Sequence, residues 1–289
     1  KFTNHLLPEN QGKEGTDMFI QEDAYFKAYA LYFKKFIEAY RGQGIDISMV
    51  MPQNEFNSCQ IFPSCTWTAK GLTKFIGEFL GPEMQEIGVD LFFGTMERPA
   101  VAIIDTVLTD PKAGKYVKGV GFQWAGKDAL PGVQEKYAPE MKLYQTEQEC
   151  GNGKNDWEHC VHSWDLMKHY LNNGVNSYLY WNISLDKGGY SRWGWQQNSL
   201  VTVDVENKTY HFNYEYYLLK HLSGFVQSGA QKLVSGKDIL AFLNPDGSVV
   251  IMLYNQNTTL KEYKFNLDET GWVANLKPLS FNTFLIKQN

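Results

Sequence analysis

The feature that most constrains the fold of this chain is an alternation of short apolar, β-branched runs with longer segments of helical periodicity, repeated through residues 1–224. Apolar side chains recur at three- and four-residue intervals over 24–40, which predicts an amphipathic helix with one buried stripe. Further helices are expected over 67–80, with Thr68 as N-cap, and over 101–108, 133–137, 157–171 and 212–222. Strands are expected over 45–52, 89–93, 117–124, 142–146 and 175–183, so that they begin at about Ile45, Val89, Val117, Lys142 and Val175. This alternation is typical of a parallel sheet with crossover helices.

The pattern changes after Gly224, where the helical period is lost. Strands are expected over 239–243, 249–255, 262–267 and 281–286. The turn sequence Asn244-Pro245-Asp246-Gly247 separates the first two of them. We therefore expect two domains, an α/β domain over 1–224 and a small antiparallel β domain over 225–289. Five β/α units are too few to close an eight-stranded barrel, so the first domain is either a smaller doubly wound sheet or the later part of a barrel.

The composition argues against two classes of protein, namely nucleic-acid binders and membrane-spanning proteins. The chain has 27 Lys and Arg against 32 Asp and Glu, a net charge of -5, and it has no basic run, which argues against a nucleic-acid binder. Its longest apolar stretches, such as 249–254, fall far short of the ~20 residues that a membrane span needs. The aromatic share of 15% suits either a large aromatic core or stacking against sugar rings. The chain opens on Lys1 without an apolar leader, so a signal peptide is expected to be absent or already removed.

Two carboxylates directly follow expected strands. Glu55 comes after the strand over 45–52, and Glu147 after the strand over 142–146. Residues at the carboxyl ends of parallel strands line the active sites of α/β folds. Two carboxylates that face each other there can hydrolyse a glycosidic bond, since one gives a proton to the leaving oxygen while the other attacks or activates water. With 32 acidic residues in the chain, chance placement near strand ends is the plain alternative.

Neighbouring residues favour the glycosidase interpretation. Asn54 offers a neutral amide beside Glu55, and Trp124 and Trp181 place aromatic planes at the ends of other strands, where they can support a sugar ring. Glu149, two residues after Glu147, competes with it for the nucleophile's role. The chemistry needs no metal and no cofactor, and none is expected.

The four cysteines fit neither a disulfide-dense scaffold nor a paired zinc motif. Cys59 with Cys65 and Cys150 with Cys160 are each near enough along the chain to pair. Four cysteines allow three pairings, and the sequence leaves their state open.

Five segments carry a resemblance to a known family. They are Met51-Pro52-Gln53-Asn54-Glu55, the stretch from Val107 to Trp124, Thr146-Glu147, the stretch from Trp157 to Asn182, and Asn244-Pro245-Asp246-Gly247-Ser248. In this order and spacing they resemble glycoside hydrolase family 30, which contains glucosylceramidases, endo-β-1,6-glucanases and some xylan-active enzymes. The resemblance implies a (β/α)8 TIM barrel with a fused small antiparallel β domain. The five strands would be strands four to eight, and the first three would precede this sequence.

The resemblance also implies roles for site residues. Glu55 matches the acid/base and Glu147 the nucleophile of a retaining mechanism on β-glucosidic linkages. Asn54 matches the amide before the acid/base, and Gln123, Trp124 and Trp181 match substrate-binding positions. The implied partner is a carbohydrate, and a secreted or periplasmic location follows from that substrate class alone.

The sequence departs from the family pattern at three positions. Phe56 stands where Pro is usual, and Gln123 and Ala125 stand where glucosylceramidase-type members carry His and Tyr. Specificity for a lipid glucoside is therefore not implied. A xylan-active enzyme and a catalytically silent carbohydrate-binding protein remain as alternatives.

Overall fold

The structure of this protein is a computed structural model that describes residues 7–234, 236, 238–267 and 270–287. The chain folds into two compact units. The first contains residues 1–149 and 173–181, and the second contains residues 150–172 and 182–289. The domain boundary near residue 224 stays a prediction.

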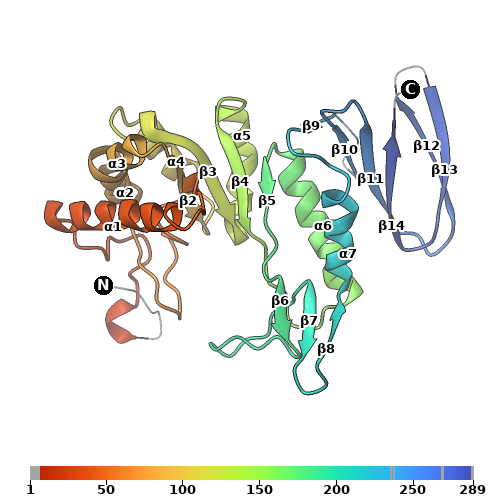
Figure 1. Cartoon of the computed structure of the whole chain (residues 1–289), viewed down its shortest axis with the longest axis horizontal. Coiled ribbons are helices and arrows are strands. Elements are labelled where there is room, and N and C mark those ends of the chain that lie inside the picture. Colours follow the sequence, from red (N-terminus) through yellow and green to blue (C-terminus); the bar gives the residue numbers. More distant parts are fainter. Residues whose placement is uncertain (1–6, 235, 237, 268–269, 288–289) are drawn as a thin grey trace. The chain divides into compact units, whose positions relative to one another are not determined.

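The first unit is built on one parallel sheet. Its strands are β1 Met49–Val50, β2 Asp90–Met96, β3 Val117–Gln123, β4 Lys142–Glu147 and β5 Ser177–Tyr178. They lie side by side in chain order, and every neighbouring pair is parallel (Figure 1). All five expected strands are present, and because parallel strands share one direction, their carboxyl ends meet at one edge of the sheet.

The two edge strands are much shorter than their apolar runs suggested. The run over 45–52 pairs for two residues only, and Pro52, which has no backbone N–H to donate, follows soon after β1. The run over 175–183 also pairs for two residues. There the N–H of Leu179 donates to the side-chain oxygen of Gln145 at 2.6 Å, so a side chain replaces the strand ladder.

Helices connect the strands of this unit. Their bounds are η1 Pro8–Asn10, α1 Asp23–Arg41, α2 Ala69–Phe75, η2 Ile76–Leu80, α3 Gly81–Glu86, α4 Val101–Leu108, η3 Gly114–Tyr116, η4 Trp124–Ala129 and α5 Leu130–Tyr137. The Thr68 hydroxyl caps α2 by accepting the N–H of Gly71 at 2.9 Å, as expected. No helix in the described part of the chain has both the length and the hydropathy to cross a lipid bilayer.

Helix α1 differs from its expected pattern. Phe26, Ala30 and Ile37 are buried, but only Ile37 belongs to the expected stripe, and two other members of that stripe, Tyr32 and Phe36, are 63% and 45% exposed. The rings of Tyr32 and Phe36 lie 6.5 Å apart along the helix. Aromatic residues cover more than one face of α1, so periodicity alone overestimated the buried stripe.

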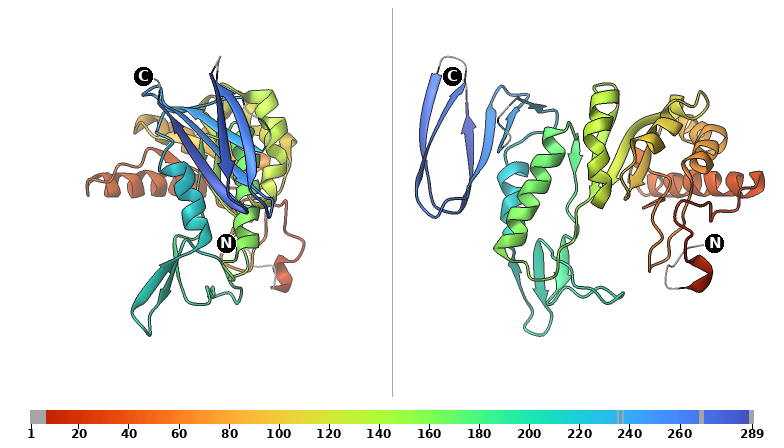
Figure 2. Two further views of the ribbon diagram at one scale, coloured as in Figure 1. Left: turned by 90° about the vertical axis from the view of Figure 1, so that its right-hand side faces the viewer. Right: turned by 180° about the vertical axis from the view of Figure 1, so that it is seen from behind.

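The second unit contains helices α6 Trp157–Asn172 and α7 Tyr214–Ser223 with three small sheets. A four-stranded sheet has the order β14-β11-β10-β9, from Ser280–Ile286, Val249–Asn255, Ile239–Leu243 and Gln231–Lys232. Strands β12 Lys261–Leu267 and β13 Thr270–Leu276 form a hairpin, and these C-terminal strands are the blue ribbons of Figure 2. The four strands expected after Gly224 are all present.

Several strands of this unit were not expected from the sequence. A three-stranded sheet is formed by β6 Ser184–Asp186, β7 Val201–Asp204 and β8 Thr209–Phe212, where no strand was expected. Phe212, which was expected to begin a helix, ends β8 instead, and α7 begins at Tyr214. Strands β9 and β13 were also not expected. Strands β6 to β9 are only two to four residues long, which is too short for an apolar alternation to identify them.

None of the four cysteines forms a disulfide bond in the structure. Cys59, Cys150 and Cys160 are buried, and Cys65 is half-buried. The pairing that the sequence left open is therefore not formed within this chain.

Candidate active site

Two consecutive residues at the end of β3 each hold one of the two candidate carboxylates. The Gln123 amide nitrogen donates to Glu55 Oε1 at 3.0 Å, and the Trp124 indole N–H donates to Glu147 Oε1 at 3.1 Å. Glu55 follows β1 and Glu147 ends β4. The structure thus gathers residues from three strands at one edge of the sheet, which we call the carboxylate edge: Glu55, Gln123, Trp124 and Glu147.

The backbone at this edge is unusual. Successive residues of a strand normally point to opposite faces. Trp124 instead has a φ of 47°, where it leaves β3 to begin η4, and its side chain joins that of Gln123 at the carboxylates. Glu55 has a φ of 48°. Positive φ is uncommon outside glycine and costs roughly 1–3 kcal/mol, and such residues cluster at functional sites.

The loop that carries Glu55 is fixed to β2 through Thr95. The backbone N–H of Glu55 donates to the Thr95 hydroxyl at 3.0 Å, and that hydroxyl donates to Asn54 Oδ1 at 3.2 Å. Glu55 itself is only 4% exposed, whereas Asn54 is exposed. The carboxyl oxygen Oε2 of Glu55 is buried and has no hydrogen-bond partner in the described part of the chain.

The surroundings of Glu55 favour its protonated form. Burial first, and then the charges of Glu147 and Glu97, raise the pKa of the Glu55 carboxyl to about 7, although hydrogen bonding from Gln123 and Gln60 acts in the opposite direction. Desolvation and like charge both disfavour a carboxylate. A carboxyl group with a pKa near neutrality can donate a proton at physiological pH.

Two effects act on the pKa of Glu147 in opposite directions. Burial raises the pKa, and the hydrogen bond from the Trp124 N–H, which stabilises the charged form, offsets part of that rise. No lysine or arginine pairs with Glu147 among the described residues, so the carboxylate is not held by an ion pair. A hydrogen-bonded, unpaired carboxylate suits attack on an electrophilic carbon.

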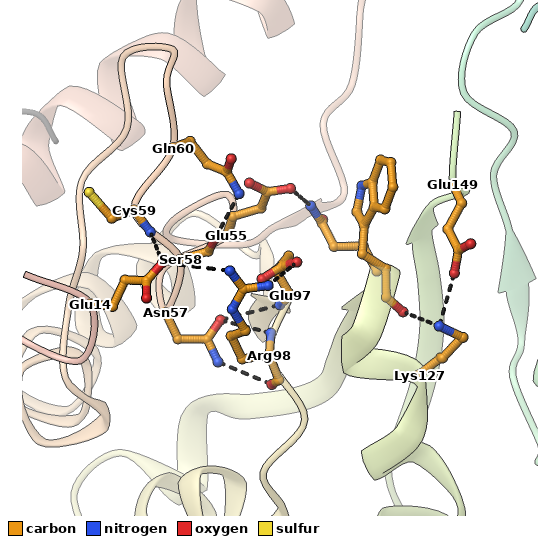
Figure 3. A network of polar contacts seen from close by, with 12 residues as sticks. Glu14, Glu55, Asn57, Ser58, Cys59, Gln60, Glu97, Arg98, Lys127 and Glu149 are labelled. Atoms are coloured by element: carbon orange, nitrogen blue, oxygen red, sulfur yellow. Dashed lines mark hydrogen bonds and ion pairs between the residues drawn. The ribbon is translucent and has the colours of Figure 1, made fainter. Parts of the chain in front are cut away.

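Glu149, the competing candidate, carries a counterion. Its Oε1 lies 2.9 Å from the Nζ of Lys127, as Figure 3 shows. Lys127 also donates to the Trp124 carbonyl at 3.3 Å. Strand β4 ends at Glu147, so the alternation that would place Glu149 on the same face does not continue. The geometry favours Glu147 over Glu149.

Trp181, which the sequence also placed in the site, is not brought to the carboxylate edge by any contact. It lies three residues beyond the end of β5, is 44% exposed, and makes no hydrogen bond or ring contact with the described residues. Gln123 is 1% exposed and directs its amide to Glu55. Contact of Gln123, Trp124 and Trp181 with a sugar stays a prediction.

The sequence analysis missed a polar network next to Glu55. Glu97 is 7% exposed, and its Oε1 pairs with Arg98 Nη1 at 2.7 Å. The Asn57 side-chain oxygen accepts the N–H groups of Glu97 and Arg98 at 3.2 and 3.3 Å (Figure 3). Strand β2 was expected to end at Phe93 but continues to Met96, so Glu97 was not recognised as a residue at a strand end.

A cavity adjoins this network within the first unit. Its volume is about 390 Å³, and its lining is formed by Asn10, Gln11, Gly12, Glu14, Cys59, Gln60 and Arg98. Apart from Gly12 and the Cys59 thiol, every lining side chain carries an amide or a charge. We call it the polar cavity.

Comparison with known protein families shows to which family the chain belongs. The glycosyl hydrolase family 30 TIM-barrel domain matches residues 8–226, and the glycosyl hydrolase family 30 beta sandwich domain matches residues 226–284. The chain belongs to glycosyl hydrolase family 30. The family and the fold class predicted from the sequence are confirmed, because both domain types are matched and the described sheets agree with them.

Individual relatives of this family 30 chain are distant. It is 26% identical to lysosomal acid glucosylceramidase of Mus musculus, over 91% of this chain and 56% of that protein. It is 25% identical to endo-1,6-beta-D-glucanase neg1 of Aspergillus fumigatus, over 80% of this chain and 50% of that protein. A solved endo-beta1,6-glucanase has the same fold, with a TM-score of 0.79 and 23% identity over 91% of this chain and 63% of that one. The chain spans about half the length of the curated relatives it matches.

Proposed function

We propose that this chain carries the catalytic carboxylates of a retaining β-glycoside hydrolase that cleaves β-glucosidic linkages, in a glucosylceramide-like glucoside or in β-1,6-glucan. The single observation that carries the proposal is the pair of hydrogen bonds from Gln123 to Glu55 and from Trp124 to Glu147. Donors from adjacent residues keep the two carboxyl groups at one edge of the sheet. Family membership adds that known relatives include a glucosylceramidase and endo-1,6-glucanases.

In the first step, ionised Glu147 attacks the anomeric carbon and the bond from that carbon to the leaving oxygen breaks. Glu55 gives its proton to the leaving oxygen, so an alcohol departs and a glycosyl ester of Glu147 remains. Oε1 of Glu55 accepts the Gln123 amide, which leaves Oε2 as the oxygen that can carry this proton. Retaining enzymes hold the two carboxyl groups ~5–5.5 Å apart.

In the second step, Glu55 acts as a base. It takes a proton from water, the resulting hydroxide attacks the anomeric carbon, and the ester bond to Glu147 breaks. Glu55 is then protonated again and Glu147 is again ionised. The loss of the Glu147 charge in the ester removes one cause of the raised pKa of Glu55, which suits its change from acid to base.

Azide rescue tests this proposal in the intact natural polypeptide. Glu147→Ala should lower kcat on an aryl β-glucoside by more than about 10³-fold, because no covalent intermediate can form. Added azide should restore turnover and yield a glycosyl azide of inverted configuration. Glu149→Ala is the matched control and should keep measurable activity without azide. If azide rescued Glu149→Ala in place of Glu147→Ala, Glu149 would be the nucleophile. No rescue of either variant would count against the mechanism.

A further inference from the structure

We infer that the polar cavity is the subsite for the leaving group, and that it binds a hydroxylated sugar ring and not the hydrocarbon of a lipid alcohol. The inference rests on the proposed function, since only a glycosidase has a leaving group to bind. It adds to that function a choice between two substrate classes, namely a glucan and a lipid glucoside.

The polar cavity lies near Glu55, the proposed acid/base, through Gln60 of its lining. In a retaining mechanism the leaving group departs on the side of the acid/base, because that residue must reach its oxygen. Gln60 connects Glu55 to the cavity. Figure 3 shows the Gln60 side chain beside the Glu55 carboxyl, and Gln60 and Cys59 of the lining lie on the same loop as Glu55. Glu55 itself is not in the lining, but the cavity lies next to its loop, and no residue of the lining comes from β4, which carries Glu147.

The lining decides which leaving group fits. A hydrocarbon chain needs apolar side chains, since it gains free energy only by leaving water for an apolar surface. The cavity offers no aliphatic or aromatic side chain. It offers instead the amides of Asn10, Gln11 and Gln60 and the charges of Glu14 and Arg98. Such donors and acceptors match the hydroxyl groups of a sugar.

The charged groups of the lining are held in place by neighbours. Arg98 pairs with Glu97 at 2.7 Å and with Glu14 at 3.5 Å, and Figure 3 shows these residues beside Glu55 and Gln60. Glu14 Oε1 also accepts the backbone N–H of Cys59 at 3.5 Å. An arginine whose rotamer is fixed loses less entropy when it binds a hydroxyl. The volume of about 390 Å³ lies within the range of about 300–1,000 Å³ that is usual for small-molecule sites.

Two ligands of the same sugar test the inference by binding. Gentiobiose carries a second glucose as its leaving group, and octyl β-glucoside carries an eight-carbon chain. Titrations would use the intact natural polypeptide with Glu147→Gln, which keeps the site but cannot form the intermediate. Adding Arg98→Ala should raise the Kd for gentiobiose by at least tenfold and the Kd for octyl β-glucoside by less than threefold. Arg41→Ala, on α1, is the matched control and should change neither Kd by more than twofold.

The outcomes separate the two proposals. Equal weakening of both ligands, or no weakening of gentiobiose, would overturn the sugar subsite. Glu14→Gln is a second variant that keeps the decision possible if Arg98→Ala fails to fold, because it removes one charge of the lining and should weaken gentiobiose selectively. Failure of the proposed function would give a different result. Arg98→Ala would still weaken gentiobiose binding selectively, but the wild-type protein would hydrolyse neither gentiobiose nor an aryl β-glucoside.

Discussion

Two buried glutamates, one in each compact unit, have the same perturbed acidity in different surroundings. Burial raises the pKa of Glu55 in the first unit and of Glu215 in the second unit to about 7. Each accepts one hydrogen bond from a side-chain amide, Gln123 for Glu55 and Asn198 for Glu215, and each has a second oxygen that is buried without a partner. By acidity alone, the two residues would be equal candidates for an active site.

The surroundings of the two carboxyl groups distinguish Glu55 from Glu215. The charge of Glu147 contributes to the pKa of Glu55, and the polar cavity is lined by Cys59 and Gln60 of the same loop. For Glu215, at the start of α7, the charge contribution comes from Asp156, after burial and hydrogen bonding. A raised pKa therefore marks burial in both places, but only at Glu55 does it coincide with a second carboxylate held by a neighbouring donor. Four measurements test this difference between the carboxylate edge and Glu215.

The largest expected effect is on catalysis. Glu55→Gln should lower kcat/KM for a glucan with a poor leaving group by roughly 10²–10⁴-fold, since general-acid assistance is lost. Glu215→Gln should lower it by less than threefold. In the parent protein, kcat/KM should fall as pH rises above about 7, where Glu55 loses its proton, and this limb should be absent in Glu55→Gln. Initial-rate kinetics across pH measure both, and equal losses in the two variants would remove the distinction.

The next effect is on stability. The carboxyl group of Glu215 has its pKa raised from 4.5 to about 7 in the folded protein, so it binds its proton more tightly in the native state. Its contribution to folding stability is therefore most favourable below pH 4.5 and declines as pH rises to 7. Glu215→Gln removes this cost and should stabilise the protein at pH 8 by up to roughly 3 kcal/mol, with little effect at pH 4. Urea unfolding at both values measures the change. A variant that is less stable at pH 8 would contradict the prediction.

A smaller effect is expected at the indole of Trp124. Trp124→Phe keeps an aromatic plane but removes the N–H that stabilises the charged form of Glu147. The pKa of Glu147 should rise, so the acidic limb of kcat/KM should move to higher pH and activity should fall by about tenfold. Trp164→Phe, on α6 in the second unit, tests whether loss of an indole elsewhere has the same effect, and an unmoved acidic limb in Trp124→Phe would contradict the assigned role.

The smallest effect is expected at Lys127, which acts through the backbone. It pairs with Glu149 and donates to the Trp124 carbonyl, so it supports the turn that directs the indole to Glu147. Lys127→Met should lower kcat by about two- to fivefold with little change in KM, and Lys127→Arg should restore most of the loss. A change in KM alone would mean that Lys127 contacts substrate and does not support the turn.

Much of the fold could be predicted because local patterns were strong. Helix α4 begins and ends at the expected residues, and the Thr68 cap was identified from residue type and position. Strand β2 was expected to end three residues too early, so Glu97 was missed. Strands β6, β7 and β8 were missed because each is only three or four residues long, which is too short for an alternation of apolar and polar residues to identify a strand.

Sequence patterns alone established that strands alternate with helices and that two glutamates follow strand ends, because burial sets the spacing of apolar residues and parallel strands share an edge. Which side chains meet at this edge became clear from the three-dimensional structure. Gln123 contacts Glu55 and Trp124 contacts Glu147 because the backbone takes a positive φ at Trp124, where η4 follows β3, and Lys127 of η4 pairs with Glu149 after β4. Such contacts depend on three-dimensional packing between distant segments, for which a single sequence carries no periodic pattern.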